Sequence, residues 1–94
     1  MLYLCNLHSM YSVYIIRCKD GSLYTGISTD VERRFLEHQK GRGARYTKMH
    51  GVDKIVYVRK CGAVGKALKR EAKIKTWPRE RKLRLVKEKP YGKK

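Results

Sequence analysis

The hydrophobic and polar positions of the chain predict a hairpin followed by a helix between residues 11 and 38. Residues 11–17 (YSVYIIR) are rich in β-branched and aromatic side chains, as a buried strand is. An Asp20-Gly21 pair then gives a hairpin signal, and residues 22–27 (SLYTGI) form the return strand.

Two registers are open to this hairpin, and they differ in where Tyr14 and Tyr24 point. A two-residue turn places the two tyrosines on opposite faces of the sheet, because side chains alternate along a strand. A three-residue turn from Lys19 to Gly21, with Gly21 in a left-handed bulge, pairs residue 14 with 26 and residue 16 with 24. We expect this second register, which places both tyrosines on one face.

A helix is predicted after the hairpin. It begins at a Thr29-x-x-Glu32 capping box and runs to about Lys40, where Gly41 stops it. The positions i, i+3, i+4 and i+7 form one stripe that consists of Val31, Arg34, Phe35 and His38.

Two polar side chains of this helix therefore share the face that the apolar residues bury. These are Arg34 and His38, whereas Arg33 and Glu37 are expected to face water. A small domain without a site would more often carry Leu or Val at such positions, so the two polar residues are candidates for chemistry.

The remaining chain predicts a third strand and two helices. The strand covers residues 53–60 with a core of Ile55, Val56, Tyr57 and Val58, and the last helix covers residues 79–89 with Leu83, Leu85 and Val86 inward. Between them, a helix over about 64–75 has an apolar stripe of Val64, Ala67, Leu68 and Ile74. Glu71 falls inside that stripe, where a carboxylate should be paired or should coordinate a ligand.

Residues 41–51 (GRGARYTKMHG) are predicted to be a glycine-rich basic loop. Its side chains suit phosphate and sugar contacts, and the candidates are Arg42, Arg45, Tyr46, Thr47 and Lys48. The alternative is a solvated flexible loop with no ligand.

The composition favours an anionic partner. The chain of 94 residues has 24 Lys and Arg against 8 Asp and Glu, a net charge of +16. Nucleic acid is the leading candidate, because counterion release gives a basic surface its affinity for polyphosphate, and an acidic membrane surface is second. No apolar run reaches membrane-spanning length, so we expect no membrane insertion.

The cysteines and the termini complete the expected organisation. Cys5, Cys18 and Cys61 are odd in number and widely spaced, which favours reduced thiols in a cytoplasmic protein. We expect a single domain over residues 11–89, an N-terminal extension over 1–10 and a frayed basic tail over 90–94, with Met10 as the natural start.

The ordered set of polar and glycine residues resembles the GIY-YIG nuclease superfamily, and most closely its small single-domain uncharacterised bacterial group. The resemblance rests on Ser12-Val13-Tyr14, Tyr24-Thr25-Gly26, Arg34, His38 and, on a later helix, Glu71. It covers residues 11–89 and implies an α+β fold, a three-stranded antiparallel sheet flanked by helices.

The same resemblance implies roles for individual residues. Tyr14 would be the general base or hold the attacking water, and Tyr24 would orient water or phosphate. Gly26 would allow close backbone approach, and His38 would lie beside the site. Arg34 would be the catalytic arginine and Glu71 the ligand of one divalent metal, Mg²⁺ or Mn²⁺.

These roles agree with phosphodiester chemistry. A guanidinium is always charged and can fork to two phosphate oxygens, while a single carboxylate with waters and a phosphate oxygen holds Mg²⁺. Free tyrosine has a pKa near ~10, so Tyr14 as a base needs help from Arg34 or the metal. The chain departs from several family nucleases in lacking a downstream asparagine, since its only asparagine is Asn6.

Three functions follow as hypotheses. The first is a metal-dependent endonuclease that cleaves DNA with low sequence specificity, in repair or recombination. The second is a module of the same fold that binds DNA or RNA without cutting it. The third is an interaction protein that uses its charge on ribosomes or acidic partners, although the sequence indicates no obligate protein partner.

Overall fold

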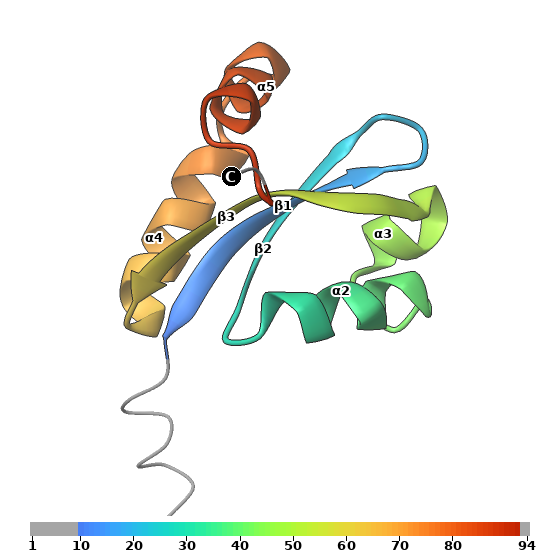
Figure 1. The fold of residues 1–94 in the computed structure, drawn as a ribbon, viewed down its shortest axis with the longest axis horizontal. Coiled ribbons are helices and arrows are strands. Elements are labelled where there is room, and N and C mark those ends of the chain that lie inside the picture. Colours follow the sequence, from blue (N-terminus) through green and yellow to red (C-terminus); the bar gives the residue numbers. More distant parts are fainter. Residues whose placement is uncertain (1–9, 93–94) are drawn as a thin grey trace, which may run out of the picture.

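The computed structural model describes residues 10–92, which form a three-stranded antiparallel sheet with four helices around it (Figure 1). The central strand is β1 (Tyr11–Cys18), with β2 (Leu23–Ser28) on one side and β3 (Val52–Gly62) on the other. The predicted α+β architecture is confirmed. Nearly all of the predicted extension over residues 1–10, including Cys5 and Asn6, and the last two residues of the predicted tail lie outside the described residues.

The three-residue turn between β1 and β2 is confirmed. Tyr14 pairs with Gly26 and Ile16 pairs with Tyr24. The Cys18 amide donates to the Ser22 carbonyl at 2.8 Å, and Gly21 has a left-handed φ of 87°. Tyr14 and Tyr24 consequently share one face of the sheet, with ring centroids 6.4 Å apart.

A bulge in β3 explains how four consecutive apolar residues can all be used. Ile15 pairs with Tyr57 and Ile16 pairs with Ile55, which leaves Val56 as an extra residue. Because the bulge interrupts the alternation of side chains, Val56 and Tyr57 pack on one face of the sheet while Ile55 and Val58 pack on the other.

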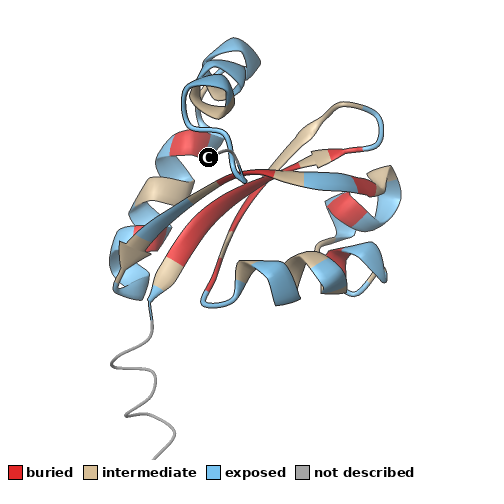
Figure 2. Ribbon diagram, in the orientation of Figure 1, coloured by how far each residue is buried: buried red, intermediate tan, exposed pale blue. Residues whose placement is uncertain are grey.

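The helices cover both faces of the sheet. Helices α2 (Val31–Gln39) and α3 (Arg45–His50) lie on one side, and α4 (Val64–Lys75) and α5 (Arg79–Glu88) lie on the other (Figure 1). Burial is concentrated along β1, whereas α5 has no buried residue (Figure 2). None of the helices in the described part of the chain has the length and apolar character to traverse a bilayer.

Two small cores result, one on each face. The core under α2 contains Tyr14, Ile16 and Val52, with Tyr24, Val31 and Phe35 packed against them. The core under α4 and α5 contains Val13, Ile15, Val56, Tyr57, Ala67 and Ile74, with Leu85 and Val86 at its edge. Glu71 is therefore carried by a helix on the opposite side of the sheet from Arg34 and His38.

The structure corrects two expectations about the helix starts and loops. The N-cap of α2 is Asp30 rather than Thr29, because an Asp30 side-chain oxygen accepts from the Arg33 amide at 3.1 Å. The segment 41–51 is not wholly a loop, since its second half forms the six-residue helix α3.

Three apolar positions expected to be inward are instead largely exposed. The exposed fractions are 44% for Val64, 48% for Leu68 and 41% for Leu83, so these three assignments were wrong. The expectation of a frayed tail is also wrong for residues 90–92. The Tyr91 amide donates to the Val56 carbonyl at 3.2 Å, and its hydroxyl donates to Glu32 at 2.7 Å. Cys18 and Cys61 are free thiols, as expected.

Candidate active site

The centre of the candidate site is the Tyr14 side chain, which is only 1% exposed. Its position follows from the hairpin register, because Tyr14 lies opposite Gly26 and its ring occupies the space above that glycine. A Cβ atom on Gly26 would lie 2.5 Å from the phenol oxygen and 2.7 Å from Cζ. The motif glycine therefore allows the backbone of β2 to approach closely, and the group that it approaches is the Tyr14 ring.

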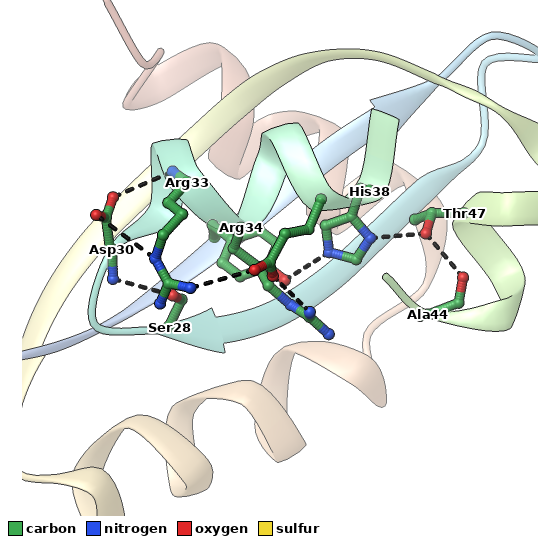
Figure 3. A network of polar contacts seen from close by, with 9 residues as sticks. Ser28, Asp30, Arg33, Arg34, His38, Ala44 and Thr47 are labelled. Atoms are coloured by element: carbon green, nitrogen blue, oxygen red, sulfur yellow. Dashed lines mark hydrogen bonds and ion pairs between the residues drawn. The ribbon is translucent and has the colours of Figure 1, made fainter. Parts of the chain in front are cut away.

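The phenol of Tyr14 is the first member of a chain of buried hydrogen bonds. Its oxygen lies 2.9 Å from His38 Nε2, and His38 Nδ1 lies 2.7 Å from Thr47 Oγ1. Thr47 in turn donates to the Ala44 carbonyl at 2.9 Å. Figure 3 shows the part of this chain from His38 through Thr47 to Ala44.

The directions of these bonds follow from the last one. A carbonyl can only accept, so the Thr47 hydroxyl proton points to Ala44 and its oxygen accepts from His38 Nδ1–H. In the neutral imidazole, Nε2 then carries no proton and accepts from the Tyr14 hydroxyl. The fold thus presents Tyr14 to a nitrogen that can take its proton.

The pKa values of both groups favour this neutral arrangement. Burial, and next to it the nearby Tyr24, raises the pKa of Tyr14 to about 12, while the Arg34 guanidinium acts in the opposite direction. Burial lowers the pKa of His38, and the Arg34 charge lowers it further. Near neutral pH the pair is accordingly a phenol that donates to an uncharged imidazole.

A second glycine makes room for the imidazole. A Cβ atom on Gly43 would overlap the His38 ring, so the backbone between α2 and α3 can pass this close only as glycine. Together, Gly26 and Gly43 flank the Tyr14–His38 pair.

The Arg34 guanidinium is held in place by Glu37. Arg34 Nη1 donates to Glu37 Oε1 at 2.9 Å, and the other carboxylate oxygen accepts from Arg33 at 3.1 Å. Glu37 therefore does more than face water, which corrects the expectation for that residue. The Arg34 side chain remains 35% exposed, so donors that Glu37 does not use are open to a ligand.

Glu71 lies on α4, on the other side of the sheet, and its charge influences the Tyr14 pKa. Burial is the main cause of the raised Tyr14 pKa, and the negative charge of the Glu71 carboxylate adds a small contribution. Its side chain is 17% exposed, and one oxygen lies 3.2 Å from Lys75 Nζ. Pairing was one of the two alternatives that the sequence left open for Glu71, and the partner in the structure is Lys75.

The donor set suits only one kind of metal ion. No cluster of three or more His, Cys, Asp or Glu side chains that could hold a metal ion occurs among residues 10–92, so these residues supply no closed coordination shell. A single partly exposed carboxylate, Glu71, fits a hard cation that takes its other ligands from water and phosphate oxygens, as Mg²⁺ and Mn²⁺ do.

Tyr24 joins the site to α3 through an edge-on contact with His38 and a stacked contact with Tyr46. Its centroid is 5.2 Å from that of His38 and 6.2 Å from that of Tyr46. Tyr46 also stacks on His50 at 4.2 Å, and His50 Nδ1 lies 2.6 Å from an Asp20 carboxylate oxygen in the hairpin turn. The turn and α3 therefore brace Tyr24 from outside the core.

The expected contact residues of segment 41–51 divide into two groups. Arg42, Arg45, Tyr46 and Lys48 are exposed beside the site, and their role in binding stays a prediction. Thr47 is 1% exposed and serves His38, so its expected contact with phosphate or sugar is wrong.

The sequence did not reveal the role of Thr47 as the partner of His38, and it did not reveal Gly43 or Glu37 as parts of the site. Glu37 could have been found, because it lies three residues after Arg34 and side chains at that spacing are neighbours on a helix. Thr47 and Gly43 give no such signal, since their roles depend on how α3 folds back against α2.

The fold and the site define a nuclease-type domain, and the chain belongs to the GIY-YIG family. The model described as "GIY-YIG catalytic domain" matches residues 10–84. A UPF0213 protein of Staphylococcus saprophyticus is 47% identical over 76 residues, which are 81% of this chain and 93% of that protein. UPF0213 proteins of Staphylococcus aureus are 50% identical over the same shares of both chains.

The fold is also similar to a solved structure. The solution NMR structure of a UPF0213 protein from Bacillus halodurans matches with a TM-score of 0.57 and 38% identity, and the match covers 88% of each chain. The family assignment and the small single-domain character of the relatives, both expected from the motifs, are confirmed.

Proposed function

We propose that this protein is a divalent-metal-dependent endonuclease that hydrolyses DNA phosphodiester bonds with low sequence specificity, in DNA repair or recombination. The observation that carries the proposal is the 2.9 Å hydrogen bond between the buried Tyr14 hydroxyl and the proton-accepting Nε2 of His38. A structural tyrosine needs only some hydrogen-bond partner, whereas this one has a partner that can accept a proton.

The pair answers the difficulty that the phenol itself is a poor base. With its pKa raised to about 12, Tyr14 holds its proton at neutral pH and is not present as a phenolate. It can still take a proton from water if its own proton passes to His38 Nε2 in the same step. Thr47 keeps its bond to Nδ1–H throughout, so the resulting imidazolium stays oriented.

The other residues act on the phosphate. The attacking water forms a bond to phosphorus, the bond from phosphorus to the leaving oxygen breaks, and solvent returns a proton to that oxygen. Arg34 would donate to the equatorial oxygens while Glu37 fixes its orientation. Tyr24, beside both His38 and Tyr14, would orient the water or the phosphate.

Glu71 would hold the metal ion. When bound, a divalent cation polarises the phosphate and steadies the leaving oxygen. Without a metal ion, the Lys75 ammonium group pairs with the Glu71 carboxylate. A divalent cation would displace the lysine because its charge is higher.

The exposed residues beside the site would contact the DNA backbone. Arg42, Arg45, Tyr46 and Lys48 lie on α3 and the segment before it, next to Tyr24.

Plasmid DNA and linear, nicked, branched and single-stranded substrates with Mg²⁺ or Mn²⁺ test the proposal. Arg34→Ala should reduce cleavage about 10²–10³-fold, as the removal of one transition-state donor does. Arg33→Ala is the matched control, because Arg33 lies on the same helix and pairs with the same carboxylate but is 61% exposed. Glu71→Ala should abolish the metal-dependent activity, and Glu80→Ala should not.

Retained DNA binding without cleavage under any divalent ion would refute the enzyme and support the non-catalytic binding module. Equal losses in Arg33→Ala and Arg34→Ala would show that only the overall charge matters. Cleavage of RNA in preference to DNA would correct the substrate and leave the chemistry in place.

A further inference from the structure

A second group of cations lies on the side of the sheet that carries α4, away from Tyr14 and His38. We call it the β3–α4 basic surface, and it consists of Arg59, Lys60, Lys66, Lys69, Arg70 and Lys73. None of the six takes part in the ion pairs found among residues 10–92, whereas the acidic residue nearest in sequence, Glu71, is paired with Lys75. The six side chains therefore form no ion pair within the described protein, and the acidic residue that lines a hollow with them is Glu88, beside Arg59 and Arg70.

Three hollows meet along this surface, and Arg70 lines all of them. One of about 380 Å³ is lined by Arg59, Lys60, Cys61, Lys66 and Arg70. The next, of about 420 Å³, is lined by Lys69, Arg70 and Lys73. The third, of about 450 Å³, runs from Arg59 and Arg70 towards α5. The cations thus border a continuous track rather than standing singly.

Arg70 is built into this track more firmly than a surface side chain. Its guanidinium lies 5.4 Å from the centroid of the Trp77 ring, and its Nε is buried without a hydrogen-bond partner in the protein. The Arg70 guanidinium is therefore packed against Trp77 rather than freely solvated, and its residue lines all three hollows.

The positions of the charged residues along α4 show that the helix has a basic flank and, on its other side, a flank that carries Glu71. Lys66, Arg70 and Lys73 follow each other at i, i+4 and i+7 on the flank towards β3. Ala67 and Ile74 are fully buried against the sheet, and Glu71 lies beyond them on the other flank, towards Tyr14. A ligand on the basic flank is therefore separate from a phosphate held at the candidate active site.

We propose that the β3–α4 basic surface binds the phosphodiester backbone of a nucleic acid segment that lies outside the cleavage site. A row of separated cations along a track matches a row of phosphates, and a single small anion would use one hollow only. The lining of the two hollows at the basic end is almost entirely cationic, which suits a polyphosphate better than a membrane that must take up apolar side chains. The inference deepens the proposed function, because it adds a second anchoring surface for the same substrate.

Binding measured without cleavage tests the inference. The triple variant Arg59→Gln/Lys66→Gln/Lys73→Gln removes three exposed cations of the track. The matched control is Lys54→Gln/Arg84→Gln/Lys87→Gln, which removes one arginine and two lysines that are also exposed and form none of the ion pairs in the described region. The two triple variants have the same net charge as each other, because each removes three cations. Binding to a 30-base-pair duplex in EDTA is measured by fluorescence anisotropy over a range of KCl concentrations.

For each phosphate contact that the track variant loses, the slope of log K against log salt should become shallower by about 0.9. The affinity of the track variant for the duplex at 0.1 M salt should fall by about 10²-fold or more. The control triple should lose only a few-fold. Equal losses of affinity in the two triple variants would overturn the proposal, since they would show that DNA binding depends on the total charge and not on this surface. A track variant that binds DNA normally but no longer binds vesicles of anionic phospholipid would also overturn it.

The outcome is independent of catalysis. A selective loss of binding in a protein that cleaves no substrate would support the surface and refute the enzyme. Metal-dependent cleavage together with equal losses in both triples would support the enzyme and refute the surface.

Discussion

The substitution Gly26→Ala is the most direct test of how the fold builds the site. The φ angle of Gly26 is not in the left-handed region, so an alanine there meets no backbone strain. In a strand, replacing such a glycine normally stabilises by about 0.4–1 kcal/mol, because the unfolded chain has less entropy to lose. The new Cβ, however, would lie 2.5 Å from the Tyr14 oxygen and 2.7 Å from Cζ, well inside van der Waals contact.

The overlap should reverse the sign of the effect. Overpacking of a core by one methyl group costs about 1–3 kcal/mol, so we expect Gly26→Ala to destabilise the protein by about 1–2 kcal/mol after the entropic gain. For a domain of this size, each kcal/mol lowers Tm by about 4–8 °C. Urea unfolding followed by circular dichroism gives the free energy, and comparison of m-values checks that the unfolding remains two-state.

A double-mutant cycle with Tyr14→Ala isolates the cause. In the Tyr14→Ala background the ring is gone, so Gly26→Ala should become neutral or stabilising, with a coupling energy of about 1–3 kcal/mol. An equal loss of stability in both backgrounds would refute the reasoning. The glycine would then be required for its backbone and not for the space that it leaves above itself.

Four further predictions follow from the buried chain of hydrogen bonds. Thr47→Val should cost about 1–3 kcal/mol by leaving the His38 Nδ1–H and the Ala44 carbonyl unpaired, and ¹⁵N NMR should show a mixture of His38 tautomers that Thr47→Ser restores to one. The folded pKa of His38 is lowered from 6.5, so stability should be complete above pH 6.5 and fall as the pH drops from there towards the folded pKa, an acid limb that His38→Asn removes, whereas cleavage should be retained below pH 6.5 until the folded pKa is reached. The folded pKa of Tyr14 is raised from 10.0 to about 12, so its stability contribution is present below pH 10 and lost above it, by up to about 3 kcal/mol, in the wild type but not in Tyr14→Phe. The triple replacement Tyr14→Phe/His38→Leu/Thr47→Val should be at least as stable as the parent in urea and have no activity, and a triple variant less stable than the parent would contradict this.

The parts of the fold that depend on local pattern could be predicted from the sequence. The register of the hairpin followed from the turn length and placed Tyr14 and Tyr24 on one face, and α4 runs from Val64 to Lys75 as its periodicity indicated. Both features depend on neighbours that are close in sequence.

The errors arose where tertiary contacts outweigh local preference. Helix α3 has only six residues and an Ala44 N-cap without a side-chain hydrogen bond, so no start signal marks it. Leu83 and Leu68 have the right spacing for burial, but the sheet has three strands and offers too little surface to cover them. The exposure of these residues is a consequence of size and not of pattern.

The candidate site residues fall into the same two groups. Tyr14, Arg34 and His38 could be identified because polar groups stood at positions that the pattern reserves for the core. Thr47 and Gly43 could not be identified, because their roles depend on contacts with His38, which lies nine and five residues away in the sequence. A site residue that supports another side chain is visible only once the two elements are packed.

The buried polar chain is hard to explain by stability alone. Tyr14, His38 and Thr47 are each at most 2% exposed, and every hydrogen bond between them replaces one that water would have made. The net gain from such bonds is small, and apolar side chains of the same shape would fill the space as well or better. The arrangement further requires glycines at positions 26 and 43, where larger residues would otherwise strengthen the strand and the loop. A protein that keeps this arrangement in a core of so few residues gives up stability for it, and the proposed proton transfer from Tyr14 to His38 is a property that an apolar core could not supply.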